Sequence, residues 1–193
     1  MSHLLEFDAG GGAPWKVFDH TNDVGGTLIT GDPAPMQSGE LVRVFAQSMA
    51  PLPTSLLFNQ HINLEGLDVG SIQGPVSVTM KSDGSYDFNG QLNNSAYLPY
   101  NFSVLFVLKS KSGTAFTFAV SNSISAGLPL SNNNYQWDNN GNNGKIKDVW
   151  GDLQAGYTAY YKAAASVDIS TLWNDLQTAI GVVSTVVAVT GSL

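Results

Sequence analysis

The stretch Ser131–Trp150, SNNNYQWDNNGNNGKIKDVW, combines aromatic rings with amides in a way that suits sugar recognition. Tyr135 and Trp137 offer flat rings that can stack on the C–H faces of a sugar, while neighbouring amides and carboxylates bond its hydroxyl groups. The polar partners that we assign to this site are Asn133, Asp138 and Asn140. The alternative is that these rings fold inward and cap an open core, which is the commoner use of large aromatic side chains.

A second polar segment with aromatic rings, NNSAYLPY, contains Tyr97 and Tyr100. Loops at the ends of strands are where β-sandwiches place their binding groups. We therefore expect the loops 93–100 and 131–144 to form one ligand-binding site, with the tyrosines and Trp137 as stacking surfaces.

A calcium loop of the EF-hand type does not fit the same stretch. Counting from Asn139 puts Gly144 at the sixth position, but Trp150 then occupies the twelfth, where a bidentate Glu is needed. Turn chemistry alone explains an Asn/Gly-rich connection, because both residues tolerate left-handed backbone. A looser calcium site stays open as an alternative, with the ligands Asp138, Asn140 and Asp148.

The segment FDHTND brings Asp19, His20 and Asp23 together and is the only His–carboxylate cluster in the sequence. A metal-assisted enzyme at this cluster is a third hypothesis, against the simpler interpretation of a polar turn after a strand. The sequence contains no Gly-x-Ser-x-Gly elbow, no cysteine and no phosphate-binding glycine loop. We therefore expect a protein that is not an enzyme and that uses no metal and no cofactor.

Composition excludes several classes of partner. The net charge is −7, only 12% of the 193 residues are charged, and Lys and Arg are scattered, so nucleic-acid binding is not expected. The N-terminus shows no basic region followed by a long apolar stretch. We expect a protein that is cytoplasmic as encoded, or exported without a classical signal peptide.

Two hairpins are the clearest elements that could position such loops. Apolar and polar residues alternate through 75–92 around Asp83-Gly84, which predicts two strands joined by a type I′ turn. The following strand bears Phe102, Val104, Phe106 and Leu108 on one face, with Leu105 and Val107 on the other. A strand that is apolar on both faces belongs at the centre of a sheet beneath another layer. Its partner returns after a turn at Ser110–Gly113.

The rest of the chain supplies further strands and a change to helical periodicity. Short apolar runs at 3–7, 15–19, 27–30, 40–47 and 55–64 alternate with Gly and Pro turns. The spacing from Ile146 to Leu153 predicts a helix, and a longer apolar stripe begins after Asp168, a natural N-cap. The run AGYTAYYKAAA is ambiguous between helix and strand, and the tail is rich in valine, which slightly weakens a helix and suits a strand.

These elements predict a mainly β protein, an antiparallel β-sandwich of about seven to nine strands with one or two C-terminal helices. We assign 1–165 to the sandwich and 166–193 to a C-terminal helical segment that packs on it or serves association. The favoured function is non-catalytic, lectin-like binding of a glycan or another polyhydroxylated surface. The alternative is a membrane-active, cytolysin-like or self-assembling protein, a homo-oligomer, that uses the apolar segment Leu176–Val189.

The order of motifs between residues 84 and 153 resembles a small microbial β-sandwich module of unassigned activity. The similarity includes Y-x-F-x-G at Tyr86, Phe88 and Gly90, followed by a polar loop and a central apolar strand. It ends in a pattern formed by Trp137, Gly141, Asn142, Ile146 and Trp150. The resemblance implies the sandwich fold and assigns no catalytic residue.

Overall fold

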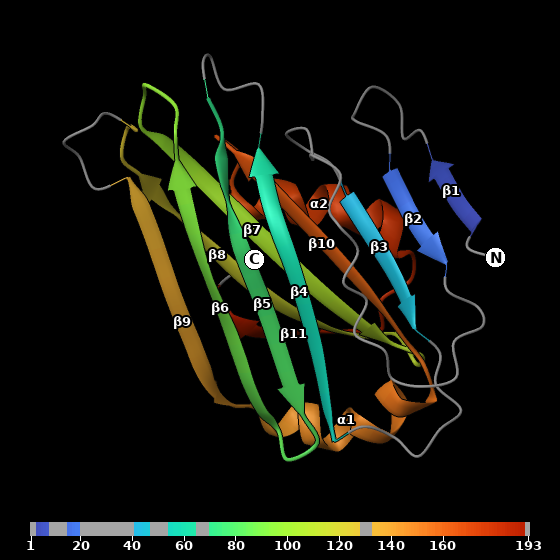
Figure 1. The fold of residues 1–193 in the computed structure, drawn as a ribbon. Coiled ribbons are helices and arrows are strands. Elements are labelled where there is room, and N and C mark those ends of the chain that lie inside the picture. Colours follow the sequence, from blue (N-terminus) through green and yellow to red (C-terminus); the bar gives the residue numbers. More distant parts are fainter. Residues whose placement is uncertain are drawn as a thin grey trace.

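The computed structural model describes residues 54–64, 70–127 and 133–191, together with the backbone of three strands at 3–7, 15–19 and 41–46. Two β-sheets face each other, and two helices follow in the C-terminal part of the chain (Figure 1). The predicted mainly β sandwich with C-terminal helices is therefore confirmed. Eight strands, β4 to β11, lie between residues 54 and 191.

The larger sheet has the strand order β1-β2-β3-β10-β7-β8-β11. Most neighbours are antiparallel, but the pairs β2–β3 and β8–β11 are parallel. The strands of this sheet are β1 (His3–Phe7), β2 (Trp15–Asp19), β3 (Leu41–Ala46), β7 (Tyr100–Ser110), β8 (Thr114–Ile124), β10 (Tyr157–Ala165) and β11 (Thr185–Thr190). The expected strand at 27–30 lies outside the described residues.

The smaller sheet has four antiparallel strands in the order β4-β5-β6-β9. These strands are β4 (Ser55–Leu64), β5 (Ile72–Lys81), β6 (Ser85–Asn94) and β9 (Asn134–Asn142). Figure 1 shows this sheet in front, with β9 along its outer edge. Residues 131–144, expected as a loop, therefore contain an edge strand.

Both predicted hairpins are present, but the turn of the first differs from the expected type. Ser82-Asp83-Gly84 and Lys111-Ser112-Gly113 are three-residue loops, in which the glycine N–H donates back to the residue before the loop. Only the glycines have positive φ, +93° at Gly84 and +95° at Gly113. A type I′ turn needs positive φ at Asp83 as well, so that prediction is wrong.

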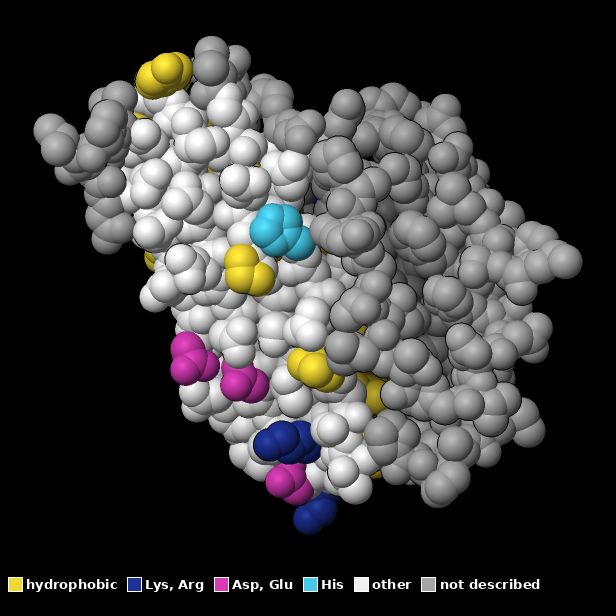
Figure 2. Space-filling view, in the orientation of Figure 1, with side chains coloured by type: hydrophobic (Ala, Val, Ile, Leu, Met, Phe, Trp, Pro, Cys, Tyr) yellow, Lys and Arg dark blue, Asp and Glu magenta, His cyan; other side chains and the backbone are white. Residues whose placement is uncertain are grey.

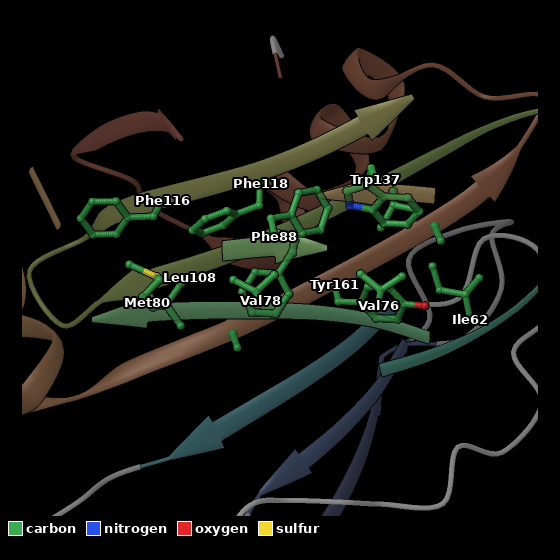
Figure 3. Packing of buried hydrophobic residues seen from close by; sticks show 14 of the residues in the cluster. Ile62, Val76, Val78, Met80, Phe88, Leu108, Phe116, Phe118, Trp137 and Tyr161 are labelled. Carbon is green, nitrogen blue, oxygen red and sulfur yellow. The ribbon is translucent and has the colours of Figure 1, made fainter. Parts of the chain in front are cut away.

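The core fills the space between the sheets (Figure 3). Phe88 and Val78 from the smaller sheet meet Phe118 and Leu108 from the larger one, and all four side chains are almost fully buried. Helix α1 (Gly144–Ala155) closes the lower end of the sandwich in Figure 1. Its buried side chains Ile146, Trp150 and Leu153 lie on one stripe, as their spacing predicts.

A second layer covers the outer face of the larger sheet. Helix α2 (Ile169–Ile180) packs its apolar stripe on Leu105 and Val107 of β7, which confirms that β7 is central and covered. Two lysines of the larger sheet contact polar groups of the helix. Lys162 Nζ lies 2.6 Å from a carboxylate oxygen of Asp175, and Lys109 Nζ donates to the carbonyl of Ile180.

The expected helical segment 166–193 is a helix followed by a strand. After Gly181 the valine-rich tail forms β11, which adds in parallel to β8 because β-branched side chains suit extended backbone. Leu176 and Ile180, part of the segment considered for membrane insertion, are buried against the sheet. Each described helix has twelve residues, too few and too polar to cross a bilayer.

Helix α2 should lose stability in acid through its N-cap. The carboxylate of Asp168 accepts hydrogen bonds from the backbone N–H of Thr171 and the hydroxyl of Ser170, and these bonds lower its pKa below 3.8. A carboxylate with a lowered pKa stabilises the fold above its unfolded pKa, and this contribution disappears as the pH falls through the folded value. We expect Asp168→Ala to lower the Tm at pH 7. Below pH 3.8 the Tm of this variant should approach that of the wild type.

Thermal unfolding followed by circular dichroism between neutral and strongly acidic pH measures this difference. Asp148→Ala is the control, because Asp148 is exposed and only 3.7 Å from Lys145 in a surface ion pair. A gap between the wild type and Asp168→Ala that stays constant with pH would contradict the assignment.

Candidate functional site

The structure separates the aromatic residues that were expected to form one binding site. Trp137 lies on β9 and is only 8% exposed. Its ring centroid is 5.6 Å from that of Phe88 and 6.3 Å from that of Phe102, so the indole belongs to the core (Figure 3). The prediction that Trp137 stacks on a sugar is therefore wrong, and the alternative of an inward cap is correct.

The three tyrosines differ in exposure. Tyr135 and Tyr100 are half-buried against the core, and the hydroxyl of Tyr135 accepts a hydrogen bond of 2.7 Å from Asn122 Nδ2. Tyr97 is 63% exposed on the loop between β6 and β7. The expected stacking surface of Tyr97, Tyr100, Tyr135 and Trp137 does not form, because β-strand alternation turns Tyr135 and Trp137 toward the interior.

The side chain of Asn133 forms a hydrogen bond with the backbone of a neighbouring strand. Its Nδ2 donates to the carbonyl of Asn94 at 2.9 Å, and Asn94 is fully buried. The Asn94 side chain in turn bonds the carbonyls of Leu98 and Ser125 and the N–H of Ala96. These amides satisfy the backbone of the loops that close this end of the sandwich, which explains their abundance without a ligand.

Asp138 and Asn140 lie on the outer face of the smaller sheet, where the register of the four strands places polar side chains in rows. We define the first row by the register of the strands as Asn59, Ser77, Asn89 and Asp138. The second row, one step along the strands, is His61, Pro75, Gln91 and Gln136. Figure 2 shows that neutral polar atoms dominate this face and that charged side chains gather toward one end.

A hollow of about 540 Å³ lies over these two rows, and we call it the amide hollow. On β5 its lining includes the short side chains of Pro75 and Ser77. The longer side chains of Asn59, Gln91 and Gln136 line it from β4, β6 and β9. All four strands of the smaller sheet therefore contribute to the hollow.

The backbone below the hollow departs from ordinary strand preferences. Pro75 occupies a central strand, although proline cannot donate to the ladder and is normally confined to sheet edges. The pairing of β5 with β6 passes from Gln73–Asn93 to Val76–Gly90, so it is interrupted at Gly74-Pro75. Such departures gather at functional sites.

The floor of the hollow depends on Gly90 and Trp137. These residues face each other across β6 and β9, and a Cβ atom on Gly90 would overlap Cζ2 and Cη2 of the indole. The indole therefore fills, from the inside, the space that glycine leaves free. Its Nε1 has no hydrogen-bond partner among the described residues, so packing alone holds the ring.

Hydrogen-bonding capacity is unevenly distributed on this face. Among the described residues, the side chains of Asn59, Ser77, Gln91 and Gln136 have no hydrogen-bond partner. Beyond the second row, Asn93 Nδ2 donates to Asn134 at 2.8 Å. Within the first row, Asn89 Nδ2 donates to Asp87 at 2.8 Å, and Asp138 accepts a hydrogen bond of 3.2 Å from Asn140 Nδ2. The hollow is thus lined by partnered and unpartnered polar side chains, and its unpartnered amides are those of Asn59, Gln91 and Gln136.

The arrangement suits binding of a neutral ligand. Each carboxamide has two N–H donors and an oxygen acceptor, which match the mixed donor and acceptor character of a hydroxyl group. Within the described ranges no three His, Asp or Glu side chains come together as metal ligands. Of the hypothetical metal cluster, His20 and Asp23 lie outside the described residues, and only the backbone of Asp19 is described.

Sequence reasoning missed Asn59, Gln91 and Gln136. Gln91 occupies a solvent-facing position of the alternating hairpin 75–92, so its outward direction was predictable. That it lies on the same face as Asn59 and Gln136 was not predictable. This requires the register of strands β4 and β9, and those two residues are more than 70 positions apart in sequence.

Neither a protein-family model nor a curated protein sequence matches this chain. The similarity of residues 84–153 to a microbial sandwich module stays a prediction. Function is therefore inferred from the residues of the amide hollow themselves.

Gly90→Ala should destabilise the protein by about 1–3 kcal/mol, since the added methyl group forces the indole out of its position. Gly151→Ala is the matched control, because Gly151 lies in α1 with no atom within 4 Å of an added Cβ. That control should be neutral or stabilising, as alanine favours helices.

Chemical denaturation measures both effects. Adding Trp137→Phe to Gly90→Ala should recover part of the loss, because the smaller ring leaves room for the methyl group. No loss from Gly90→Ala, or no recovery in the double variant, would refute the proposed contact.

Proposed function

We propose that this protein is a non-catalytic binding protein that recognises a neutral polyhydroxylated ligand, a glycan, in the amide hollow. The proposal keeps the ligand class inferred from the sequence and moves the site from the loop aromatics to the outer face of the smaller sheet. The observation that carries it is the group of unpartnered amides around a hollow of about 540 Å³.

The size of the hollow supports a small ligand or a short segment of a larger one, since ligand sites commonly measure about 300–1,000 Å³. Gln91 and Gln136 lie side by side in register on β6 and β9, so one hydroxyl-bearing ring can contact both amides. The ring of Pro75 on the adjacent strand β5 supplies an apolar surface for the C–H face of a sugar.

The residue types in the hollow also support selection for binding. Asn, Gly and Pro are disfavoured in strands, yet all three occur at this place in the sheet. Gly90 is explained by its contact with Trp137, but no such packing contact explains Asn59, Asn89 and Pro75. A requirement other than stability therefore explains these three residues. Recognition of hydroxyl groups is such a requirement.

The membrane-active or self-assembling alternative has less support. The apolar side of α2 is already used against β7 and β10, and Leu176 has no exposed surface. Insertion of Leu176–Val189 into a bilayer would require α2 to leave the sheet and expose Leu105 and Val107. That rearrangement costs buried apolar surface on both partners.

A glycan array followed by isothermal titration calorimetry tests the proposal. We expect binding of one or more neutral glycans, and about a tenfold loss of affinity for Gln91→Ala or Gln136→Ala, because each removes hydrogen bonds to the ligand. Gln177→Ala is the matched control, since Gln177 is exposed on α2 at the opposite side of the molecule.

Tyr97→Ala distinguishes the hollow from the loop site predicted from the sequence. Tyr97 is exposed at the end of the sandwich and is not part of the lining of the hollow, so this change should leave affinity unaltered. The proposal fails if no neutral glycan binds, or if binding is lost in Tyr97→Ala and kept in both glutamine variants.

A further inference from the structure

We infer that the amide hollow holds an internal segment of a linear, uncharged glycan that lies across the strands, from β4 to β9. This inference rests on the proposed function and specifies its substrate class. It follows from the direction, the length and the charge of the hollow.

The direction follows from which residues line the hollow. The lining takes two or three consecutive residues from each strand of the smaller sheet, beginning with Asn59 on β4 and ending with Asp138 on β9. The hollow is therefore short along the strands and extends across all four of them. A ligand that fills it runs perpendicular to the strands.

The length follows from strand spacing. Neighbouring strands are about 4.8 Å apart, so the three intervals from β4 to β9 measure about 14 Å, while two rows measure about 7 Å along a strand. A site twice as long as it is wide fits about three sugar rings in line. It is poorly matched to a single terminal ring.

The open end of the hollow favours an internal segment. β9 is the last strand of the smaller sheet, and its hollow-lining side chains Gln136 and Asp138 are exposed. In the part of the chain that the structure describes, no further strand of this sheet closes the groove on that side. A chain longer than the hollow can therefore continue past the edge.

The charge of the lining selects against acidic sugars. Among the described residues, Asp138 is the one charged residue that lines the hollow, and Asp87 lies one row beyond Asn89. Lys81, the lysine of β5, lies two steps along the strand from Ser77 and outside the lining. A carboxylate or sulfate on the ligand would meet Asp138 without a compensating cation.

Calorimetry tests the length of the glycan segment that the hollow binds. The ligands are linear gluco-oligosaccharides of one to six residues, in β-1,4-, β-1,3- and α-1,4-linked series. We expect affinity in the binding series to rise up to about three residues and then to stay constant. Asn59→Ala, at the β4 end, should reduce the affinity for the trisaccharide more than that for the monosaccharide. A monosaccharide that binds as tightly as the trisaccharide overturns the inference and leaves the proposed function intact.

Oligogalacturonates of the same lengths test whether the hollow discriminates against acidic sugars. We expect them to bind at least tenfold more weakly than the neutral series, and Asp138→Asn to narrow that ratio. Asp148→Asn, an exposed carboxylate on α1, is the control and should leave the ratio unaltered. Equal binding of acidic and neutral chains overturns the inference, whereas absence of binding by every neutral glycan overturns the proposed function as well.

Discussion

The contact between Gly90 and Trp137 is the interaction on which the smaller sheet depends. Gly90 leaves a space on the inner side of β6, and the indole of Trp137 fills it from β9. The same ring contacts Phe88 and Phe102, so it links both sheets in one apolar cluster. With this side chain anchored inside, strand alternation directs Gln136 and Asp138 outward, where they complete the amide hollow.

Low charge accompanies this architecture. The chain has few charged residues, and its solvated surfaces use amides and hydroxyls instead. On the outer face of the larger sheet, α2 removes apolar surface from water, and Lys162 is compensated by Asp175. The smaller sheet has no described helix on its outer face, so its neutral polar rows remain accessible (Figure 1, Figure 2). We therefore propose the outer face of the smaller sheet as the ligand-binding face.

Local patterns in the sequence predicted most of the fold. The alternation around Asp83-Gly84, the two-sided apolar strand at Phe102–Leu108 and the N-cap Asp168 each depend on neighbouring residues, and each appears in the structure. Strand β9 was missed because Asn and Gly dominate it and hide the alternation of Tyr135 and Trp137. Its place in the sheet comes from pairing with β6, some 40 residues earlier, and no local pattern encodes that pairing.

The candidate site was less predictable than the fold for the same reason. The ligand class suggested by amides and rings stays a prediction, whereas Trp137 serves packing and the unpartnered amides of the hollow come from three separate strands. Titration of 15N-labelled protein with the binding linear oligosaccharide, followed in the side-chain amide region of the NMR spectrum, tests the central claim most directly. We expect the side-chain NH₂ signals of Gln91 and Gln136 to shift on binding. Shifts confined to the loop around Tyr97, with those signals unchanged, would contradict the account.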